Sequence, residues 1–485
     1  MLMLEIYLVC TPGLEGLLAA ESRALGLRVR DHEPGGVTVD GDLADIVRAN
    51  IGLRTASRVL VRVASFRATA FHELERSARR IAWDRFIGSG APAVRVRATC
   101  RRSKLYHSDA VAERVLGAIE RLTGTGGAMS PPAVAATSAK TRDAKAKKRD
   151  RRGGADDARS FIPAGTNPSA RTAAARAAAK QSIAAAAGKA AARAASEAAI
   201  ESEKAARLAL GGAMDGAGRA DAQRESDDEH DEGAGAQLVV VRFLRDECTI
   251  SIDSSGALLH RRGYRQATAK APLRETLAAA MLLASDWTGD TPLVDPLCGA
   301  GTIPIEAALI ARRIAPGRAR AERGELAIAQ WPELPRGEIE RQVEAARGNE
   351  LASARVPIVG SDRDPGAIEA AVANAERAGV SADVQFVQRA LSAANPVGDV
   401  PGLLIANPPY GVRLNEGADV RNIYAQLGKV AHFSFPEWRV GVLSPDRALD
   451  SQTRLPLRQA FETSNGGIRV RYLATPAEPV KTPTE

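Results

Sequence analysis

Residues 293–311 read LVDPLCGAGTIPIEAALIA: a short apolar run ending at Asp295, a turn containing Gly299 and Gly301, and an amphipathic helix beginning near Thr302. Glycine adopts the backbone angles of tight turns at little cost and lets backbone N–H groups approach a ligand closely. A strand, a glycine turn and a helix in this order are typical of open α/β sheets that bind nucleotides beyond their carboxyl strand ends. A pyrophosphate binder is the alternative, although a proline replaces the third glycine of the fingerprint G-x-G-x-x-G.

A second strand and helix are predicted in residues 356–380, VPIVGSDRDPGAIEAAVANAERAGV. An acidic residue at the end of the second strand can accept hydrogen bonds from ribose hydroxyls. Asp364, followed by Pro365, has the sequence expected of a helix cap. We therefore expect Asp362 to bind a ribose and Asp364 to cap the helix; the simpler alternative is that both residues only serve the helix start.

The third motif lies in residues 402–414, GLLIANPPYGVRL, where an apolar strand ends in Asn407, Pro408, Pro409 and Tyr410. Consecutive prolines stiffen the loop and offer no N–H. The Asn407 side-chain oxygen and the Pro408 carbonyl can accept both hydrogens of an exocyclic base amine, and Tyr410 offers a face for stacking. Such contacts would orient the amine towards an electrophilic methyl group, which is catalysis by positioning. For the tetrapeptide alone, a Pro-Pro turn with a packing tyrosine is the alternative.

Strand and helix patterns alternate through residues 256–475, which predicts a catalytic domain with a mainly parallel sheet. The candidate strands are 293–294, 355–360, 384–387, 402–406 and 439–444. The sequence FETSNGG followed by IRVRYLAT predicts a hairpin, because Asn-Gly-Gly suits a tight turn between two β runs. The sheet is therefore expected to end in an antiparallel strand, before a tail at 476–485.

The N-terminal part is predicted to be smaller α and β units. Residues 1–43 form an expected α/β module, with a strand at 2–10 and a helix in the leucine-rich run after it. Residues 44–123 follow with strands at 59–66 and 93–100 and helices at 73–86 and 108–122. This second segment carries 16 Lys or Arg against 7 Asp or Glu, a surplus of 9, whereas the whole chain has a net charge of +8. A surplus of positive charge that is confined to one segment indicates a polyanion partner. The alternative is a solvated arginine-rich surface.

The composition changes between residues 124 and 235. A basic tract, a long alanine-rich run and the acidic sequence ESDDEHDEG follow one another with almost no large apolar residues. Such a segment cannot bury a core, so we expect a disordered insertion with at most a nascent or isolated helix. It either adds weak affinity for polyanions or is simply tolerated. The β pattern returns at 237–253, which is the expected last strand of the basic segment.

Cysteine, histidine and apolar patterns exclude several classes of protein. The cysteines stand singly, at Cys10, Cys100, Cys248 and Cys298. Neither they nor the dispersed histidines have metal-ligand or disulfide-framework spacing, so no metal site is expected. The N-terminus lacks the pattern of a signal peptide, and no apolar run reaches the length of a membrane span. We expect a cytoplasmic protein with reduced thiols.

Together, the three motifs resemble class I S-adenosylmethionine methyltransferases of the NPPY amino-methylating type. The stretches CTPGLEGLLAAESRALG, ANIGLRTASRVLVRVASF and RRSKLYHSDAVAERVLGAI resemble the N-terminal and THUMP regions of RNA guanine-N2 methyltransferases. IDSSGALLHRRGYRQATAKAPLRETLAAAML resembles their entry into the catalytic domain. The resemblance covers most of the chain except 124–235. It is greatest to the ribosomal large-subunit RNA guanine-N2 family, with the tRNA-acting relatives second.

This resemblance implies an α/β fold: a Rossmann-like seven-stranded methyltransferase sheet with an N-terminal α+β THUMP-type RNA-binding region. It implies S-adenosyl-L-methionine as methyl donor and no metal. By motif, the implied cofactor-binding residues are Asp295, Gly299, Gly301, Thr302, Asp362 and Asn407, and the implied catalytic residues are Asn407, Pro408, Pro409 and Tyr410. Pro272–Leu277 matches a helix start that helps to close the cofactor pocket. One departure concerns the adenine, since Gln388, Arg389 and Ala390 stand where the family often has an acidic residue.

The expected activity is methylation of a base exocyclic amine, most simply guanine N2 of large-subunit ribosomal RNA. No general base is evident, and the proton can leave after transfer. The target base must be unpaired or flipped out. Phosphates would be held by the basic segment, continued by Arg261, Arg262 and Arg265. The alternatives are a tRNA guanine-N2 enzyme, a DNA or RNA adenine-N6 enzyme, a non-catalytic RNA-binding assembly factor and a nucleotide-dependent oxidoreductase.

Overall fold

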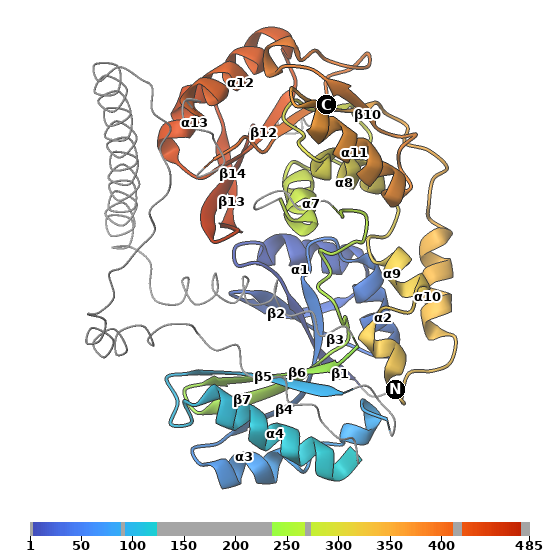
Figure 1. Cartoon of the computed structure of the whole chain (residues 1–485), viewed down its shortest axis with the longest axis vertical. Coiled ribbons are helices and arrows are strands. Elements are labelled where there is room, and N and C mark those ends of the chain that lie inside the picture. The colour runs from blue at the N-terminus through green and yellow to red at the C-terminus, as the bar shows by residue number, and fades with distance from the viewer. Residues whose placement is uncertain (1–2, 89–92, 124–234, 267–272, 411–419, 477–485) are drawn as a thin grey trace, which may run out of the picture. The chain divides into compact units, whose positions relative to one another are not determined.

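Two seven-stranded sheets organise the chain in the computed structural model, which describes residues 3–88, 93–123, 235–266, 273–410 and 420–476 (Figure 1). The first sheet belongs to the N-terminal part and the second to the C-terminal part. The predictions for the insertion at 124–235, for Pro272 and for nearly all of the tail lie outside the described residues.

The first sheet has the strand order β2-β3-β1-β4-β7-β6-β5. Its strands are β1 (Leu4–Val9), β2 (Arg28–Glu33), β3 (Gly36–Gly41), β4 (Arg58–Arg67), β5 (Val94–Arg101), β6 (Gln237–Leu244) and β7 (Glu247–Asp253). The accompanying helices are α1 (Glu15–Ala24), α2 (Leu43–Gly52), α3 (Phe71–Ala78), the 3-10 turn η1 (Trp83–Arg85) and α4 (Ser108–Thr123). β1 pairs antiparallel with both β3 and β4, so one sheet runs through the predicted module and the basic segment.

Two predictions in this region differ from the structure. The helix expected over 73–86 ends at Ala78, because the Trp83 indole N–H donates to the Ala78 carbonyl over 2.9 Å and so takes an acceptor that a continuing helix would need. The single strand expected over 237–253 is two strands, β6 and β7. They are joined by Arg245 and Asp246, which both adopt left-handed backbone angles (φ +53° and +68°).

The second sheet has the strand order β10-β9-β8-β11-β12-β14-β13. Its strands are β8 (Leu293–Asp295), β9 (Ile358–Asp362), β10 (Gln385–Gln388), β11 (Leu403–Ala406), β12 (Arg439–Ser444), β13 (Arg458–Asn465) and β14 (Ile468–Ala474). The helices are α7 (Glu275–Ala284), α8 (Thr302–Ala311), α9 (Arg318–Glu322), η2 (Ala327–Gln330), α10 (Glu338–Arg347), α11 (Pro365–Ala378), η3 (Leu391–Ala393), α12 (Val420–Ser434) and α13 (Arg447–Thr453). The predicted α/β fold with a seven-stranded C-terminal sheet is confirmed.

Alternating residues of the central strands enter two separate cores, one on each face of this sheet. In β11, Leu403 and Ile405 belong to the core that includes α7 and α8, whereas Leu404 and Ala406 belong to the core that includes α12. Successive strand side chains point to opposite faces, so a strand covered on both faces is apolar throughout. β11 reads LLIA for this reason and has no polar residue until its carboxyl end.

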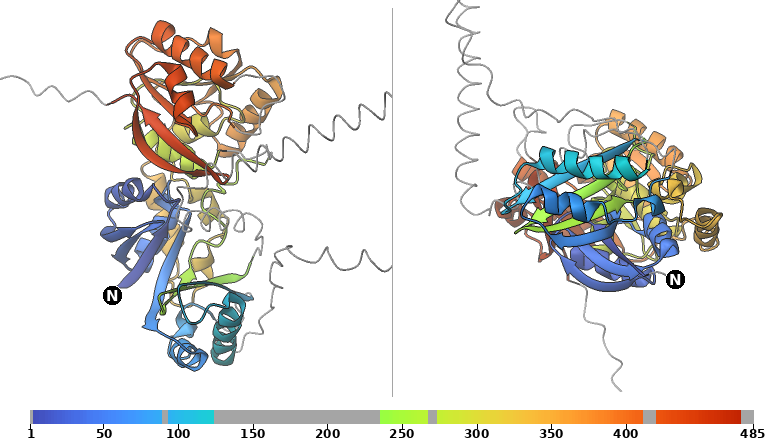
Figure 2. Two further views of the ribbon diagram at one scale, coloured as in Figure 1. Left: turned by 90° about the vertical axis from the view of Figure 1, so that its left-hand side faces the viewer. Right: turned by 90° about the horizontal axis from the view of Figure 1, so that it is seen from below.

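The C-terminal hairpin has the predicted form. β13 and β14 pair antiparallel, and β14 also pairs antiparallel with β12 at the edge of the parallel strands. Gly466 and Gly467 adopt left-handed angles (φ +58° and +78°), which a two-residue hairpin turn of this type requires. The hairpin strands (red) lie against each other in both Figures 1 and 2.

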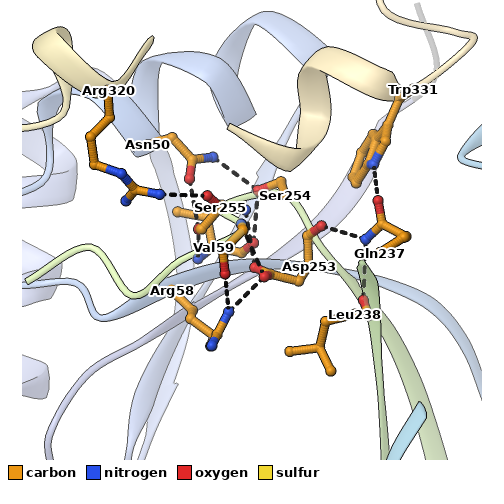
Figure 3. Close-up of polar contacts among 11 residues, drawn as sticks. Asn50, Arg58, Val59, Gln237, Leu238, Asp253, Ser254, Ser255, Arg320 and Trp331 are labelled. Atoms are coloured by element: carbon orange, nitrogen blue, oxygen red, sulfur yellow. Dashed lines mark hydrogen bonds and ion pairs between the residues drawn. The ribbon is translucent and has the colours of Figure 1, made fainter. Parts of the chain in front are cut away.

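A buried polar network joins the first sheet to the segment that leads into the second (Figure 3). Arg58 Nη1 donates to Asp253 Oδ2 over 2.6 Å, and Asn50 Nδ2 donates to Ser254 Oγ over 2.9 Å. From the connection between β8 and β9, Arg320 Nη2 donates to the Ser255 carbonyl over 3.0 Å. These buried polar groups find their partners only when the segments are in this arrangement, so the hydrogen bonds favour a single arrangement of the joined segments.

Among the described residues, no helix is both long enough and apolar enough to cross a membrane.

Candidate active site

The three motifs meet at the carboxyl edge of the second sheet. β9, β8 and β11 are adjacent and parallel, so they end at the same edge. Asp295 ends β8, Asp362 ends β9, and Asn407 directly follows β11. In open α/β sheets this edge is where ligands bind.

The two glycines of the turn after β8 have different roles. Both adopt left-handed angles, φ +50° at Gly299 and +83° at Gly301. A Cβ atom at Gly301 would lie 2.9 Å from Ala371 Cβ and from Phe386 Cζ, so close packing excludes a side chain there. At Gly299, a Cβ would meet no heavy atom of the described residues within 4 Å. Gly301 therefore allows the turn to pack against α11 and β10, whereas Gly299 leaves space in front of the turn.

Asp362 accepts hydrogen bonds from the glycine turn and from the N-cap residue of α11. The Gly299 N–H donates to Asp362 Oδ2 over 3.1 Å, and the Asp364 N–H donates to Asp362 Oδ1 over 3.0 Å. Asp364 Oδ1 accepts from the Gly366 N–H over 2.9 Å, which confirms the prediction that Asp364 caps α11. A carboxylate has about four acceptor positions, so the partly exposed Asp362 keeps capacity for further donors such as hydroxyls.

Asp295 lies in the interior beneath the turn, 1 % exposed. Burial raises the pKa of its carboxyl to about 8; the Leu297 N–H, which donates to Oδ1 over 3.0 Å, opposes the rise in pKa, and the charge of Asp362 adds to it. Asp295 thus orders the start of the turn by accepting a backbone hydrogen bond, and near neutral pH it holds a proton. Thr302, also predicted to contact the cofactor, is a buried residue at the first position of α8.

Sequence reasoning missed Asn374. Its Nδ2 donates to the Ala300 carbonyl over 2.9 Å, so a side chain of α11 supports the centre of the glycine turn. The residue is 1 % exposed. The available signal was an asparagine at a position of the helix PGAIEAAVANAERA that faces inward, where an apolar residue is the rule.

Asn407 Oδ1 is buried and has no hydrogen-bond partner among the described residues. An unpaired buried carbonyl oxygen costs free energy, and most such groups in folded proteins have a partner. Pro408 is buried and Pro409 half-buried beside it. The stiff strand end therefore presents an acceptor that no described residue of the protein uses.

Tyr410 does not offer the open stacking face predicted from the sequence. Its side chain is 1 % exposed, and its hydroxyl accepts a hydrogen bond from Asn465 Nδ2 over 2.7 Å. Asn465, 2 % exposed, is the last residue of β13, so the C-terminal hairpin reaches the motif at residues 407–410. Sequence reasoning used Asn465 only as a turn signal and missed this contact.

Two of the three arginines expected to extend a phosphate-binding surface pair with buried carboxylates instead. Arg262 is 6 % exposed; its Nε donates to Glu306 of α8 over 3.3 Å and its Nη2 donates to the Arg54 carbonyl over 2.7 Å. Arg265 pairs with Glu275 at the start of α7 over 2.9 Å. The prediction was wrong for Arg262 and Arg265, because these carboxylates pack against them, whereas for Arg261 it stays a prediction. Burial raises the pKa of Glu275 to about 7, although Arg265 opposes this rise.

Gln388 and Arg389, at the end of β10, contact the end of β9. Gln388 is exposed, and its Nε2 donates to the Arg363 carbonyl over 3.3 Å. The Arg389 N–H donates to the Asp362 carbonyl over 2.8 Å.

Family models match two parts of the chain. Residues 262–473 match the model described as the RMKL-like methyltransferase domain, and residues 5–60 match the RlmL ferredoxin-like domain. The first match contains all three motifs of the carboxyl edge. The second covers β1 to the start of β4.

Curated relatives match at moderate identity. A ribosomal RNA large subunit methyltransferase K/L of Vibrio campbellii is 37% identical over 236 residues, which cover 47% of this chain and 33% of the relative. A protein of the same name from Syntrophotalea carbinolica is 29% identical over 480 residues, covering 97% of this chain and 53% of the relative. The chain spans between a third and about three fifths of the length of the curated relatives it matches.

Solved structures share the fold over nearly the whole chain. A crystal structure from Listeria monocytogenes, described as a predicted N6-adenine-specific DNA methylase, superposes with a TM-score of 0.67 at 26% identity and covers 97% of this chain and 96% of its own. The crystal structure of SMU.472, described as complexed with SAH, has a TM-score of 0.67 at 22% identity and covers 99% and 100%. The latter likeness shows the fold alone.

Sheet order, motif placement and family models agree on a fold of S-adenosylmethionine-dependent methyltransferases. Residues 262–473 of the chain are therefore similar to RMKL-like methyltransferase domains, and residues 5–60 are similar to the RlmL ferredoxin-like domain.

Proposed function

We propose that this chain methylates an exocyclic amine of a base in RNA, with guanine N2 of large-subunit ribosomal RNA as the favoured target. The observation that carries the proposal is the buried Oδ1 of Asn407, which has no hydrogen-bond partner in the described part of the chain. An amine hydrogen would satisfy this oxygen at the end of a proline-stiffened strand, and the Pro408 carbonyl would accept the second hydrogen.

The carboxyl edge has the groups needed for S-adenosylmethionine. Open space at Gly299 would admit the ligand beside the turn, and Asp362 would accept from ribose hydroxyls. When bound, the cofactor supplies an electrophilic methyl group. Asn407 would hold the amine nitrogen in a fixed direction, so that catalysis comes from positioning rather than from a general base. In the part of the chain that the structure describes, no group of three potential ligands could hold a metal ion.

RNA is favoured as substrate by the basic segment and by the names of the curated relatives. Some arginines of that segment have partners within the protein: Arg58 pairs with Asp253, and Arg54 Nη2 donates to the Ile314 carbonyl over 2.8 Å. Others are exposed, namely Arg67, Arg76, Arg79, Arg80, Arg102, Lys104, Arg114 and Arg121. This exposed set is large enough to contribute a salt-sensitive attraction to phosphates. A THUMP-type role for residues 44–123 with 237–253 is part of the same proposal.

Adenine N6 in DNA is the second candidate. The same acceptors suit that amine, and the similar structure from Listeria monocytogenes is described as an adenine-specific DNA methylase. The two candidates differ in substrate rather than in the geometry of transfer.

The test uses the full chain with isotope-labelled S-adenosylmethionine and three unmodified substrates: ribosomal RNA, tRNA and duplex DNA. Nucleosides released by digestion are separated and identified by mass spectrometry. We expect label in N2-methylguanosine of ribosomal RNA. Label in methyladenine of DNA would instead support the second candidate. Cofactor binding without label in any substrate would favour a non-catalytic assembly factor.

Asn407→Ala supplies the matched control for chemistry. It removes the acceptor but not the glycine turn, so methyl transfer should fall by at least 100-fold while S-adenosylmethionine affinity changes little. If transfer and cofactor affinity fall equally, Asn407 serves the shape of the pocket and does not hold the amine.

A further inference from the structure

Three loops of the first sheet meet around one carboxylate, Asp246. Its Oδ1 accepts from the Lys104 N–H over 2.7 Å, its own N–H donates to Ser103 Oγ over 3.0 Å, and its carbonyl accepts from the Ala68 N–H over 3.0 Å. The Arg245 N–H donates to the Arg101 carbonyl over 3.1 Å. The ends of β4, β5 and β6 are thus tied into one loop cluster, which we call the Asp246 cluster (residues 67–68, 101–107 and 245–246).

Left-handed backbone angles concentrate in the Asp246 cluster. Among the described residues other than glycine, seven have positive φ, and three of them are here: Arg102 (+48°), Arg245 (+53°) and Asp246 (+68°). Such angles cost free energy for residues with a Cβ; at Arg245 and Asp246 they are the angles of the two-residue hairpin turn between β6 and β7. The hydrogen bonds to Asp246 compensate this cost and hold the loops in place.

The side chains displayed by the Asp246 cluster are basic and aromatic. Arg67, Arg102, Lys104 and Arg245 are exposed. Tyr106 is 69 % exposed, one of the largest exposed apolar side chains, and its ring centroid lies 4.1 Å from that of His107. Buried Leu105, between Lys104 and Tyr106, anchors their loop in the core. The Tyr106 ring is therefore held on an anchored loop with most of its surface accessible, which leaves it available for stacking.

We propose that the Asp246 cluster binds RNA directly, with Arg102, Lys104 and Arg245 contacting phosphates and the Tyr106 ring stacking on an unpaired base. Cations beside an exposed ring match a single-stranded or looped nucleic acid, whose backbone and bases alternate over short distances. Duplex DNA offers no unstacked base, so its phosphates could contact the basic side chains but no base could stack on Tyr106. The inference rests on the proposed RNA substrate and adds the surface that holds it.

The test measures binding of the full chain to unmodified ribosomal RNA at several salt concentrations. The variant R102N/K104Q/R245N removes three charges; asparagine is chosen where the backbone is left-handed because it tolerates that region. Loss of about three phosphate contacts should reduce the slope of log K against log salt by about 2. Tyr106→Ala should weaken binding roughly tenfold without changing the slope, and Tyr106→Phe should restore it.

The matched control is R336A/R355A, two exposed arginines of the C-terminal part, which should leave RNA affinity unchanged. Thermal unfolding and S-adenosylmethionine binding confirm that each variant is folded. If the triple variant loses no more affinity than the control, or Tyr106→Phe binds as weakly as Tyr106→Ala, the proposal is overturned. A different result would contradict the proposed function. If RNA binds through this cluster but is never methylated, the proposed activity is wrong, whereas the proposed binding surface is still supported.

Discussion

Asn465 Nδ2 donates a 2.7 Å hydrogen bond to the hydroxyl of Tyr410 in the protein interior, so the turn of the C-terminal hairpin holds the last residue of the tetrapeptide proposed to be catalytic. Tyr410 lies three residues after Asn407, whose oxygen is left without a partner among the described residues. A tethered tyrosine at one end and a strand at the other leave the intervening prolines little freedom. The hairpin therefore contributes to the rigidity on which catalysis by positioning depends.

Removing this tether should lower turnover more than cofactor affinity. Tyr410→Phe keeps the buried ring and deletes the acceptor, which leaves Asn465 Nδ2 buried and unpaired at a cost of about 1–3 kcal/mol in stability. We expect kcat to fall by roughly tenfold, while the Kd for S-adenosylmethionine stays within about twofold. Steady-state kinetics and calorimetric titration measure the two quantities.

A double-mutant cycle with Asn465→Ala checks that the effect belongs to the pair. If the hydrogen bond transmits the effect, adding Asn465→Ala to Tyr410→Phe should lower kcat little further. Additive losses would mean that the two residues act independently, and Tyr410 would then need another role in the site.

Substitutions of the two turn glycines should separate stability from binding. Gly301→Ala forces a Cβ to within 2.9 Å of Ala371 and Phe386, so thermal stability should fall by several degrees. Gly299→Ala meets open space and costs only about 1 kcal/mol for its left-handed angle. It should nevertheless weaken S-adenosylmethionine binding by at least tenfold, because the methyl group occupies ligand space. Equal cofactor affinity in Gly299→Ala and wild type would show that the ligand does not approach this turn.

The buried carboxyl of Asp295 should make stability depend on pH. Its pKa is raised to about 8 in the folded protein, whereas an unfolded aspartate releases its proton near pH 4. Between these values the folded state holds the additional proton, so this residue's contribution to stability is complete below about pH 4 and is lost as the pH rises through 8. Asp295→Asn keeps an acceptor for the Leu297 N–H and cannot ionise. The Tm of the variant minus that of wild type should increase from pH 5 to pH 9; a constant difference would contradict the assignment.

Shortening the insertion should preserve the first sheet. β5 and β6 pair in parallel, so the chain must cross back between them, and α4 already provides that crossover. We propose that residues 126–233 can be replaced by a flexible linker of about ten residues, which leaves the ends of α4 and β6 intact. The shortened protein should unfold in a single transition at a Tm close to that of wild type and retain methyl transfer. An unfolded product would show that the segment contributes to the core.

Local sequence determined which residues could act and where the main elements lie. Each of the three site motifs could be recognised within about twenty residues of sequence. They are an apolar strand that ends in Asp295 before two glycines, a second strand that ends in Asp362, and a third that is followed by Asn407. Parallel strands bring their carboxyl ends to one edge, so those three residues were predictable as neighbours. The hairpin at Gly466 and Gly467 was equally local, because turn chemistry depends on two or three residues.

Tertiary structure alone decided the use of side chains whose partners are distant in the sequence. The sequence predicted an exposed stacking face at Tyr410, but in the folded protein Asn465 donates a hydrogen bond to its hydroxyl. The sequence likewise predicted a surface cation at Arg262, which is bonded to Glu306 and to the Arg54 carbonyl in the interior. Likewise, only the packed sheet shows that Gly301 is enclosed and Gly299 open, and that Asp246 ties three loops together. Burial and pairing are properties of the assembled core, since they depend on groups that composition, periodicity and spacing do not identify.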